Sequence, residues 1–335
     1  LNHIYGSGCA GSRFLNGTLD IHLELEEKLA DFVNKEEALV FSTGYQVNLG
    51  VISSITNRQD YIILDELDHA CIIDGSRLSF AKPVKFRHND MASLEKVLQR
   101  LEPDRLKLIA VDGVFSMEGD LAKLDKIVAL AKKYGANIMV DDAHGLGVMG
   151  KGGRGTVDHF GVNDDVDLIM GTFSKSLASI GGFIASDHAT INFLKHHARS
   201  LIFSASIAPA NAASVIAAID LIKAEPKRID TLWENTDFTI NALRQLGFDI
   251  GHTETPIIPI YIRDTNKTFM MTRMLLEEGV FVNPVITPAV KPTDSLIRFS
   301  LMATHTKDQI SEALEKIEKI SRQLDIPKLQ NVHVE

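Results

Sequence analysis

Short apolar runs alternate with stretches of helical periodicity through the first two hundred residues, and this alternation constrains the fold more than any other feature. The apolar runs fall at residues 38–41, 61–64, 84–87, 106–111, 137–140, 167–171 and 182–185. The helical stretches before and between them include residues 21–33, 69–78, 91–101 and 121–133. Strands this short, separated by helices of about ten or more residues, are typical of a parallel sheet. The chain is therefore predicted to be an α/β protein with a mostly parallel sheet.

The pattern changes after Pro226, where a different arrangement begins. Periodicity predicts helices at 229–246 and 269–278, and strands at 257–262, 280–282 and 296–300. A last helix should follow Thr306, because Gln309 three positions later completes a capping box. We expect an N-terminal segment 1–20, a large domain 21–225 and a smaller α+β domain 226–335. Because the chain starts without Met, the N-terminal segment is expected to be truncated.

The glycines of the N-terminal segment match a nucleotide-binding pattern that we reject. Gly6-Ser7-Gly8-Cys9-Ala10-Gly11 fits G-x-G-x-x-G. That fingerprint needs a strand before it and a helix that opens inside it. Residues 12–17 instead read as another loop, so residues 6–17 are predicted to be a loop of close backbone approach.

Composition excludes several classes of partner. The net charge of −9 argues against nucleic acid, because phosphate binding needs a basic face. No apolar run reaches the roughly 18 residues that cross a bilayer, and residues 1–15 are too polar for a signal peptide. The two cysteines, Cys9 and Cys71, fit a reducing, intracellular setting. We therefore expect a cytoplasmic protein.

The apolar run at 138–140 leads directly into Asp141, Asp142, Ala143, His144 and Gly145. Open α/β sheets bind their ligands at the carboxyl ends of strands, and this segment has the pattern of such an end. A carboxylate held there away from water needs a partner. Taken alone, however, the segment is better explained as an ordinary strand end with solvated acids.

Lys175 supplies the second element of a candidate site. It follows the next predicted strand, between Ser174 and Ser176, and lies 34 residues after Asp141. A lysine at a strand end is expected to be partly desolvated, which lowers its pKa and favours Schiff-base formation. Pyridoxal phosphate chemistry requires such a lysine and an aspartate beside the pyridine nitrogen. The alternative is an ordinary surface lysine in a polar loop.

A phosphate group would need a cradle, and Ser42-Thr43-Gly44-Tyr45 is predicted to open a helix whose free N–H groups favour an anion. Thr172 and Ser174 could add hydroxyl donors. A simple helix cap is the alternative interpretation. His69 follows another strand end and is either a capping histidine or one that stacks on a cofactor ring. A metal site at Asp141, Asp142 and His144 is disfavoured, because no further ligand lies at suitable spacing.

Three motifs together resemble the α-oxoamine synthases, a family of fold-type I pyridoxal phosphate transferases. They are Val140-Asp141-Asp142-Ala143-His144, Gly171-Thr172-Phe173-Ser174-Lys175 and Ile202-Phe203-Ser204-Ala205-Ser206. The resemblance runs from Tyr5 to about residue 320. Within the family, residues 6–17, 41–50 and 64–75 look most like the bacterial members that use L-serine.

The resemblance implies a role for each matching residue. Lys175 would bind the cofactor covalently and act as acid and base at Cα, and Asp141 would pair with the pyridine nitrogen. His144 would hydrogen-bond the phenolic oxygen, and His69 would stack on the ring and orient the substrate carboxylate. The phosphate would be held by Gly44, Tyr45, Thr172 and Ser174 of one subunit and by Ser204 of the other subunit of a homodimer with a shared site. The substrate carboxylate would also lie near Ser12 and Arg298.

This chain departs from the family pattern in three places. Asp142 stands where many relatives have Glu, and its role is left open. We expect that the N-terminal segment that contributes a substrate-binding asparagine in relatives is missing here. Residues 283–288 lack the Arg-Pro-Pro seen in several relatives, so carboxylate binding by an arginine there is in doubt.

The resemblance implies a decarboxylative condensation of L-serine with a long-chain acyl-coenzyme A, such as palmitoyl-coenzyme A, to 3-ketodihydrosphingosine. The alternatives within the family use glycine with acetyl-coenzyme A or alanine with pimeloyl-coenzyme A. An aminotransferase and a catalytically silent partner subunit are further alternatives. The lipid character of substrate and product leaves open a transient contact with the inner membrane surface.

Overall fold

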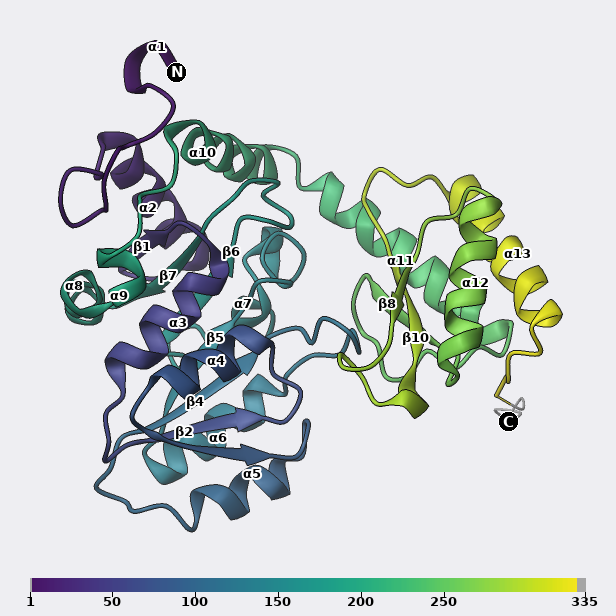
Figure 1. Ribbon diagram of the computed structural model, residues 1–335, viewed down its shortest axis with the longest axis horizontal. Helices are drawn as coiled ribbons and strands as arrows, with labels where there is room; N and C mark the ends of the chain where they lie inside the picture. Colours follow the sequence, from purple (N-terminus) through teal and green to yellow (C-terminus); the bar gives the residue numbers. More distant parts are fainter. Residues whose placement is uncertain (1, 330–335) are drawn as a thin grey trace. The chain divides into compact units, whose positions relative to one another are not determined.

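The structure, a computed structural model, describes residues 2–329, so residues 1 and 330–335 of the expected terminal segments lie outside it. The chain forms two compact units (Figure 1). The first takes in the chain as far as Phe115 together with Ala122–Glu225. The second takes in Ser116–Leu121 and the chain from Pro226 onward. The segment Ser116–Leu121 thus groups with the second unit, although the division drawn from sequence placed it in the large domain.

A seven-stranded sheet forms the centre of the first unit (Figure 1). Its strands are β1 (Glu37–Phe41), β2 (Tyr61–Asp65), β3 (Lys82–Phe86), β4 (Lys107–Asp112), β5 (Asn137–Asp141), β6 (Leu168–Thr172) and β7 (Gly182–Ser186). Their order across the sheet is β1-β7-β6-β5-β4-β2-β3. Only β7 runs against its neighbours β6 and β1. The predicted α/β fold with a mostly parallel sheet is therefore confirmed.

Helices cover both faces of the sheet, because each buried strand presents apolar side chains to both sides. One face packs against α3 (Gly44–Ile55), α4 (Ala70–Leu78), α8 (His188–His197) and α9 (Arg199–Ile202). The other packs against α2 (Asp20–Val33), α5 (Met91–Leu98), α6 (Leu124–Tyr134) and α10 (Pro209–Ala224). We call these the α3 face and the α2 face.

Strand alternation separates the two neighbouring acids at the end of β5. Met139 packs into the α3 face, whereas Ile138 and Val140 pack into the α2 face. Since successive side chains point to opposite sides of a strand, the side chain of Asp141 points to the α3 face and that of Asp142 to the α2 face. Adjacent carboxylates in the sequence therefore reach different surroundings.

The N-terminal segment is mostly irregular, as predicted. A single helical turn, α1 (Asn2–Tyr5), precedes residues 6–17, and α2 begins only at Asp20. No strand precedes the glycines within the described residues and no helix opens among them, which confirms that the pattern is not a dinucleotide fingerprint. Two short helical segments, η1 (Lys151–Gly153) and α7 (Thr156–His159), follow β5.

The second unit contains a three-stranded antiparallel sheet of order β8-β10-β9. Its elements are α11 (Lys227–Gln245), β8 (Ile257–Tyr261), α12 (Thr265–Glu277), β9 (Asn283–Val285), η2 (Pro292–Asp294), β10 (Leu296–Ser300) and α13 (Lys307–Gln323). The capping box at Thr306 and Gln309 is present. The predicted strand 280–282 is wrong, because the Val280 amide donates 2.8 Å to Leu275 O at the end of α12. Pairing with β10 starts at Asn283.

None of the helices within residues 2–329 combines the length and apolar character needed to span a bilayer.

Candidate active site

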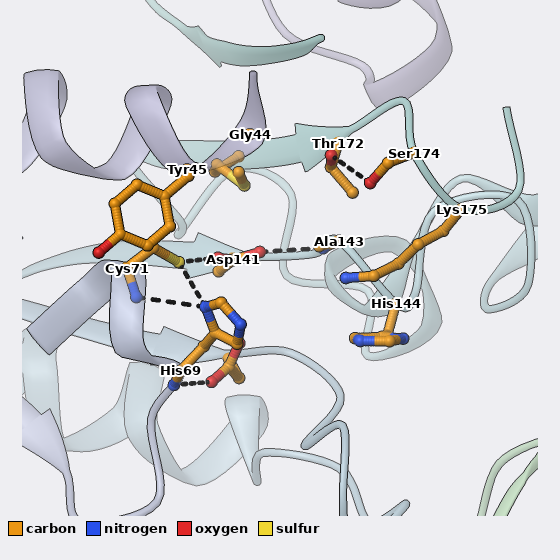
Figure 2. Close-up of a pocket in the computed structure, with 12 residues that line it drawn as sticks. Gly44, Tyr45, His69, Cys71, Asp141, Ala143, His144, Thr172, Ser174 and Lys175 are labelled. Carbon is orange, nitrogen blue, oxygen red and sulfur yellow. Dashed lines mark hydrogen bonds between the residues drawn. The ribbon is translucent and has the colours of Figure 1, made fainter. Parts of the chain in front are cut away.

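The carboxyl ends of β4, β5 and β6 border a cavity of about 240 Å³ in the first unit (Figure 2). Twelve residues line it: Gly44, Tyr45, His69, Cys71, Asp112, Asp141, Ala143, His144, Met170, Thr172, Ser174 and Lys175. The structure thus brings together eight of the residues singled out from the sequence. We call this cavity the Lys175 pocket.

The N-terminus of α3 forms one wall of the pocket. Thr43 caps the helix, and its hydroxyl accepts a hydrogen bond of 3.2 Å from the Gln46 amide. A Cβ on Gly44 would lie 2.6 Å from Thr172 Oγ1, so only glycine fits this approach. The hydroxyls of Thr172 and Ser174 lie 3.1 Å apart on the facing strand end. Free helix N–H groups and two hydroxyls therefore face one space, and an anion would be stabilised there.

Lys175 extends from the loop after β6 toward the ring of His144 (Figure 2). The loop is held by the Ser176 hydroxyl, which donates 2.6 Å to Leu146 O, and by the Ser179 amide, which donates 2.8 Å to Phe173 O. Lys175 is exposed in the single chain, and the predicted partial desolvation of its side chain stays a prediction. Residues 174–176 are all exposed, because they follow the buried end of β6.

Asp141 lies at the bottom of the pocket and is almost fully buried, with 3% of its surface exposed. Its Oδ1 accepts a hydrogen bond of 3.1 Å from the Ala143 amide. Its Oδ2 accepts one of 2.6 Å from Asn48 Nδ2 (on α3), and the Cys71 thiol lies 3.7 Å away. Hydrogen bonds to both oxygens satisfy a buried carboxylate and fix its orientation.

His69 combines the two interpretations that its sequence allowed. It caps α4, because its Nδ1 accepts a hydrogen bond of 3.2 Å from the Cys71 amide. Its ring also lines the Lys175 pocket, and Nδ1 lies 2.8 Å from the Cys71 sulfur (Figure 2). The His69 amide donates 2.7 Å to Asp112 Oδ2. Contacts of both the side chain and the main chain of His69 therefore hold the ring in place.

Asp112 ends β4 beside Asp141 and belongs to a buried pair of carboxyl groups. Asp68 Oδ1 accepts a hydrogen bond of 3.1 Å from the Asp112 amide. Burial, and then the charge of Asp141, raises the pKa of Asp112 well above its ordinary value, whereas Lys175 acts to lower it. Burial, and then the charge of Asp112, likewise raises the pKa of Asp68. These two carboxyl groups therefore keep their protons to a higher pH than exposed carboxyl groups do.

Asp142 is fully buried on the α2 face and does not reach the pocket lining. Its Oδ2 accepts 2.7 Å from the Thr156 amide, and its Oδ1 accepts 2.8 Å from the Thr156 hydroxyl. Burial raises the pKa of Asp142 to about 7, against the lowering effect of these hydrogen bonds. Asp142 therefore ties the segment that follows His144 to the sheet. Within residues 2–329, no group of three His, Cys, Asp or Glu residues could hold a metal ion.

Three of the residues singled out from the sequence do not line the Lys175 pocket. Ser12 and Ser204 border a separate hollow of about 390 Å³ in the first unit. The Ser204 hydroxyl accepts 3.0 Å from Gln46 Nε2, and Ser12 Oγ is buried with no hydrogen-bond partner among the described residues. Arg298 lies on β10 of the second unit, where its Nε donates 2.7 Å to Ser116 O. Burial lowers the pKa of the Arg298 guanidinium.

Sequence reasoning missed Asn48, Cys71 and Asp112. Asp112 could have been predicted, because it ends an apolar strand in the same way as Asp141. Asn48 lies one helical turn after Gly44, a spacing that places both on one side of α3. Cys71 carried no signal of its own beyond its closeness to His69.

A family model described as "Aminotransferase class I and II" matches residues 7–317. The chain belongs to this family. A serine palmitoyltransferase from Bacteroides ovatus is 63% identical over 324 residues, which cover 97% of this chain and 82% of the relative. An 8-amino-7-oxononanoate synthase from Alkaliphilus metalliredigens is 46% identical over 323 residues, with coverage of 96% and 82%.

Solved structures agree with this assignment. The serine palmitoyltransferase of Sphingomonas wittichii superimposes with a TM-score of 0.94 at 40% identity, covering 97% of this chain and 82% of that one. The enzyme from S. paucimobilis, solved with bound PLP and myriocin, gives the same TM-score at 37% identity and the same coverage. The chain is thus a fold-type I pyridoxal phosphate enzyme that resembles the α-oxoamine synthases, as predicted.

The residues of the Lys175 pocket fit pyridoxal phosphate. A helix N-terminus whose glycine leaves no room for a Cβ suits its phosphate, and a buried carboxylate with both oxygens hydrogen-bonded suits its ring nitrogen. Lys175 supplies an amine in the same cavity for the aldehyde.

Proposed function

We propose that this protein is a serine palmitoyltransferase. It condenses L-serine with palmitoyl-coenzyme A or another long-chain acyl-coenzyme A, and the products are 3-ketodihydrosphingosine, carbon dioxide and free coenzyme A. The observation that carries the proposal is the convergence of Lys175, Asp141 and the N-terminus of α3 on one pocket, in a chain 63% identical to an enzyme of that name.

Pyridoxal phosphate, when bound, withdraws electrons from Cα of the amino acid and so makes its proton removable. Asp141 holds the proton of the ring nitrogen, since a buried carboxylate favours a positive partner. Gly44, Tyr45, Thr172 and Ser174 bind the phosphate. Together these residues anchor both ends of the cofactor.

Lys175 would hold the cofactor covalently and would act as acid and base at Cα of the amino acid. Its amine lies in the pocket beside the other cofactor-binding residues. His144 would hydrogen-bond the phenolic oxygen of the cofactor. His69 would stack on the ring, and its contacts with Cys71 and Asp112 would hold it in that position.

The substrate carboxylate is assigned to His69, Ser12 and Arg298. His69 already lies in the pocket. Ser12 and Arg298 are assigned from the motifs that they match, and each role stays a prediction. Replacing Arg298 by Lys, which keeps the charge but loses the planar fork, should raise KM for serine far more than KM for the acyl-coenzyme A.

Titration of the purified protein with single amino acids tests the substrate assignment. L-serine should produce a saturable change in cofactor absorbance, and palmitoyl-coenzyme A should then release coenzyme A and carbon dioxide in equal amounts. A response to alanine with pimeloyl-coenzyme A would favour the 8-amino-7-oxononanoate synthase alternative, which the 46% identical relative supports. A response to glycine with acetyl-coenzyme A would indicate a glycine C-acetyltransferase. Amino transfer to a keto acid would indicate an aminotransferase.

Borohydride reduction followed by peptide mapping tests the covalent role of Lys175. The pyridoxyl tag should fall on Lys175 and be absent from the Lys175→Ala variant. Lys151, an exposed lysine after β5, provides the matched control, and its Ala variant should be tagged like the wild type. A tag elsewhere, or no tag at all as a silent subunit would give, contradicts the mechanism.

We further propose a cytoplasmic homodimer in which Ser204 reaches the phosphate bound by the partner. Leu15 and Phe203, which border the Ser12–Ser204 hollow, are 79% and 72% exposed, and such apolar side chains favour association. Sedimentation should give a dimer, and mixing Lys175→Ala with Ser204→Ala subunits should restore activity at hybrid sites. A fully active monomer would contradict this proposal. Cell fractionation should leave the protein in the supernatant, with any membrane-bound part released by salt.

A further inference from the structure

Asn48 is a buried polar residue that none of the roles above uses. It lies on α3 with no exposed surface, among the apolar side chains that pack this helix onto the sheet. Its Oδ1 has no hydrogen-bond partner among the described residues. A buried acceptor without a partner costs free energy, and an apolar residue of the same shape would avoid that cost.

The other end of the same amide makes two contacts. Nδ2 donates 2.6 Å to Asp141 Oδ2 and lies 2.9 Å from the Cys71 sulfur. Both partners line the Lys175 pocket. Only the NH2 group of the Asn48 side chain therefore has hydrogen-bond partners among the described residues, and these partners orient it toward the carboxylate at the bottom of the pocket.

Packing of α4 against α3 sets this geometry. A Cβ on Gly75 would lie 2.8 Å from Asn48 O, so a glycine on α4 permits the close approach of the two helices at Asn48. That approach brings Cys71, in the first turn of α4, against the Asn48 amide. Burial raises the pKa of the Cys71 thiol, so its sulfur accepts the amide proton as a neutral group.

Asn48 also lies four residues after Gly44, one turn along the same helix. The first turn of α3 faces the predicted phosphate site, and the second turn holds Asp141. A single rigid helix therefore determines the distance between the anion cradle and the carboxylate.

We propose that Asn48 is a positioning residue that holds the Asp141 carboxylate in register with the phosphate cradle at the N-terminus of α3. It acts on the cofactor through Asp141 and touches neither the substrate nor the reacting atoms. The inference rests on the proposed use of pyridoxal phosphate in this pocket, and it goes beyond the roles that the family motifs assign.

The contacts predict a specific pattern of binding. Loss of one hydrogen bond to a charged group weakens an interaction by about ten- to a hundredfold. Asn48→Ala should therefore raise the dissociation constant of pyridoxal phosphate by that factor. The affinity of the apoprotein for inorganic phosphate, which tests the cradle alone, should stay within about twofold, because Gly44 and its neighbours are unchanged.

Two further variants make the test independent of simple loss of packing. Asn48→Asp keeps the shape of the side chain but places a second carboxylate 2.6 Å from Asp141 Oδ2, so repulsion should weaken cofactor binding and make it depend steeply on pH. Asn235→Ala is the matched control. Asn235 is another buried asparagine, in the second unit, whose Nδ2 donates 2.8 Å to His305 O. This control should lose stability and keep the wild-type dissociation constant.

A double-mutant cycle with Asp141→Asn shows whether Asn48 acts through Asp141. The effect of Asn48→Ala on the dissociation constant should largely disappear in the Asp141→Asn background. Equal effects in both backgrounds would overturn the proposal, and so would Asn48→Asp binding the cofactor as the wild type does. Failure of the serine titration with normal cofactor binding would reject the proposed function and leave this inference intact.

Discussion

Replacing Asp142 by Asn would remove the charge of a carboxyl group that has no contact with water. The two oxygens of Asp142 accept hydrogen bonds from the amide and the hydroxyl of Thr156. In the variant, the remaining oxygen can keep the amide bond, and the new NH2 group can donate to the hydroxyl. Glycines surround the site, since a Cβ on Gly145 or Gly155 would lie 2.0 Å from an Asp142 oxygen. The isosteric Asn therefore fits where larger residues would not.

The size of the change in unfolding free energy follows from the pKa of Asp142, which burial raises from 3.8 to about 7. Between these values the unfolded chain releases its proton while the folded chain keeps it, so the free energy of unfolding falls as pH rises. Each pH unit within this window costs about 1.4 kcal/mol, which amounts to about 2.5 kcal/mol between pH 5 and pH 8. The cost is fully present above the folded pKa and vanishes below the unfolded one. The Asn variant does not titrate, so its stability relative to the wild type should rise by that amount.

Urea unfolding of the apoprotein at pH 5, 6, 7 and 8 measures this difference. Circular dichroism is the suitable signal, because the single tryptophan, Trp233, lies in the second unit and would not report on Asp142. Asp158→Asn is the matched control, since Asp158 is a half-buried carboxylate of the same region that accepts 2.7 Å from the Lys151 amide. It removes a carboxylate of the same segment that is only partly buried, so only Asp142→Asn tests the effect of full burial. A stability difference for Asp142→Asn that does not change with pH would refute the argument that burial dominates the pKa of Asp142.

Three shorter predictions test other parts of the first unit. Glu26→Ala should cost about 3–5 kcal/mol of unfolding free energy in urea titrations, because it leaves buried Arg13 without its bidentate partner; an effect below about 1 kcal/mol would contradict this. Gly44→Ala should weaken phosphate binding about tenfold or more in equilibrium dialysis, since its Cβ would lie 2.6 Å from Thr172 Oγ1; unchanged affinity would place the anion elsewhere. Cys71 should resist a chromogenic thiol reagent until the protein unfolds, because burial raises the pKa of its thiol; rapid reaction of the native protein would show that the pocket wall opens.

Much of the first unit could be predicted from sequence because its strands are buried on both faces. Such strands are continuous apolar runs, and the residue that ends each run marks the carboxyl edge of the sheet. That rule placed Asp141, Thr172 and His69 at one edge. The same rule applied to β4 would have placed Asp112 there too.

Other features depend on contacts that no local pattern contains. Val280 was predicted to begin a strand, but the end of α12 engages its amide. The exposure of Lys175 in the single chain depends on the loop after β6, in which residues 174–176 are all exposed. Asp142, which had no role from sequence, is explained by Thr156, fourteen residues further along the chain.

The sequence by itself determined the kind of fold and the chemistry of the pocket, because strand periodicity and residue type are local properties. Only the tertiary structure decided how that chemistry is held. Adjacent aspartates diverge because a strand alternates its faces, so that Asp141 meets Asn48 and Cys71 while Asp142 meets Thr156. Those partners lie on separate helices and loops, and only the packing of α3 and α4 against the sheet brings the first two together.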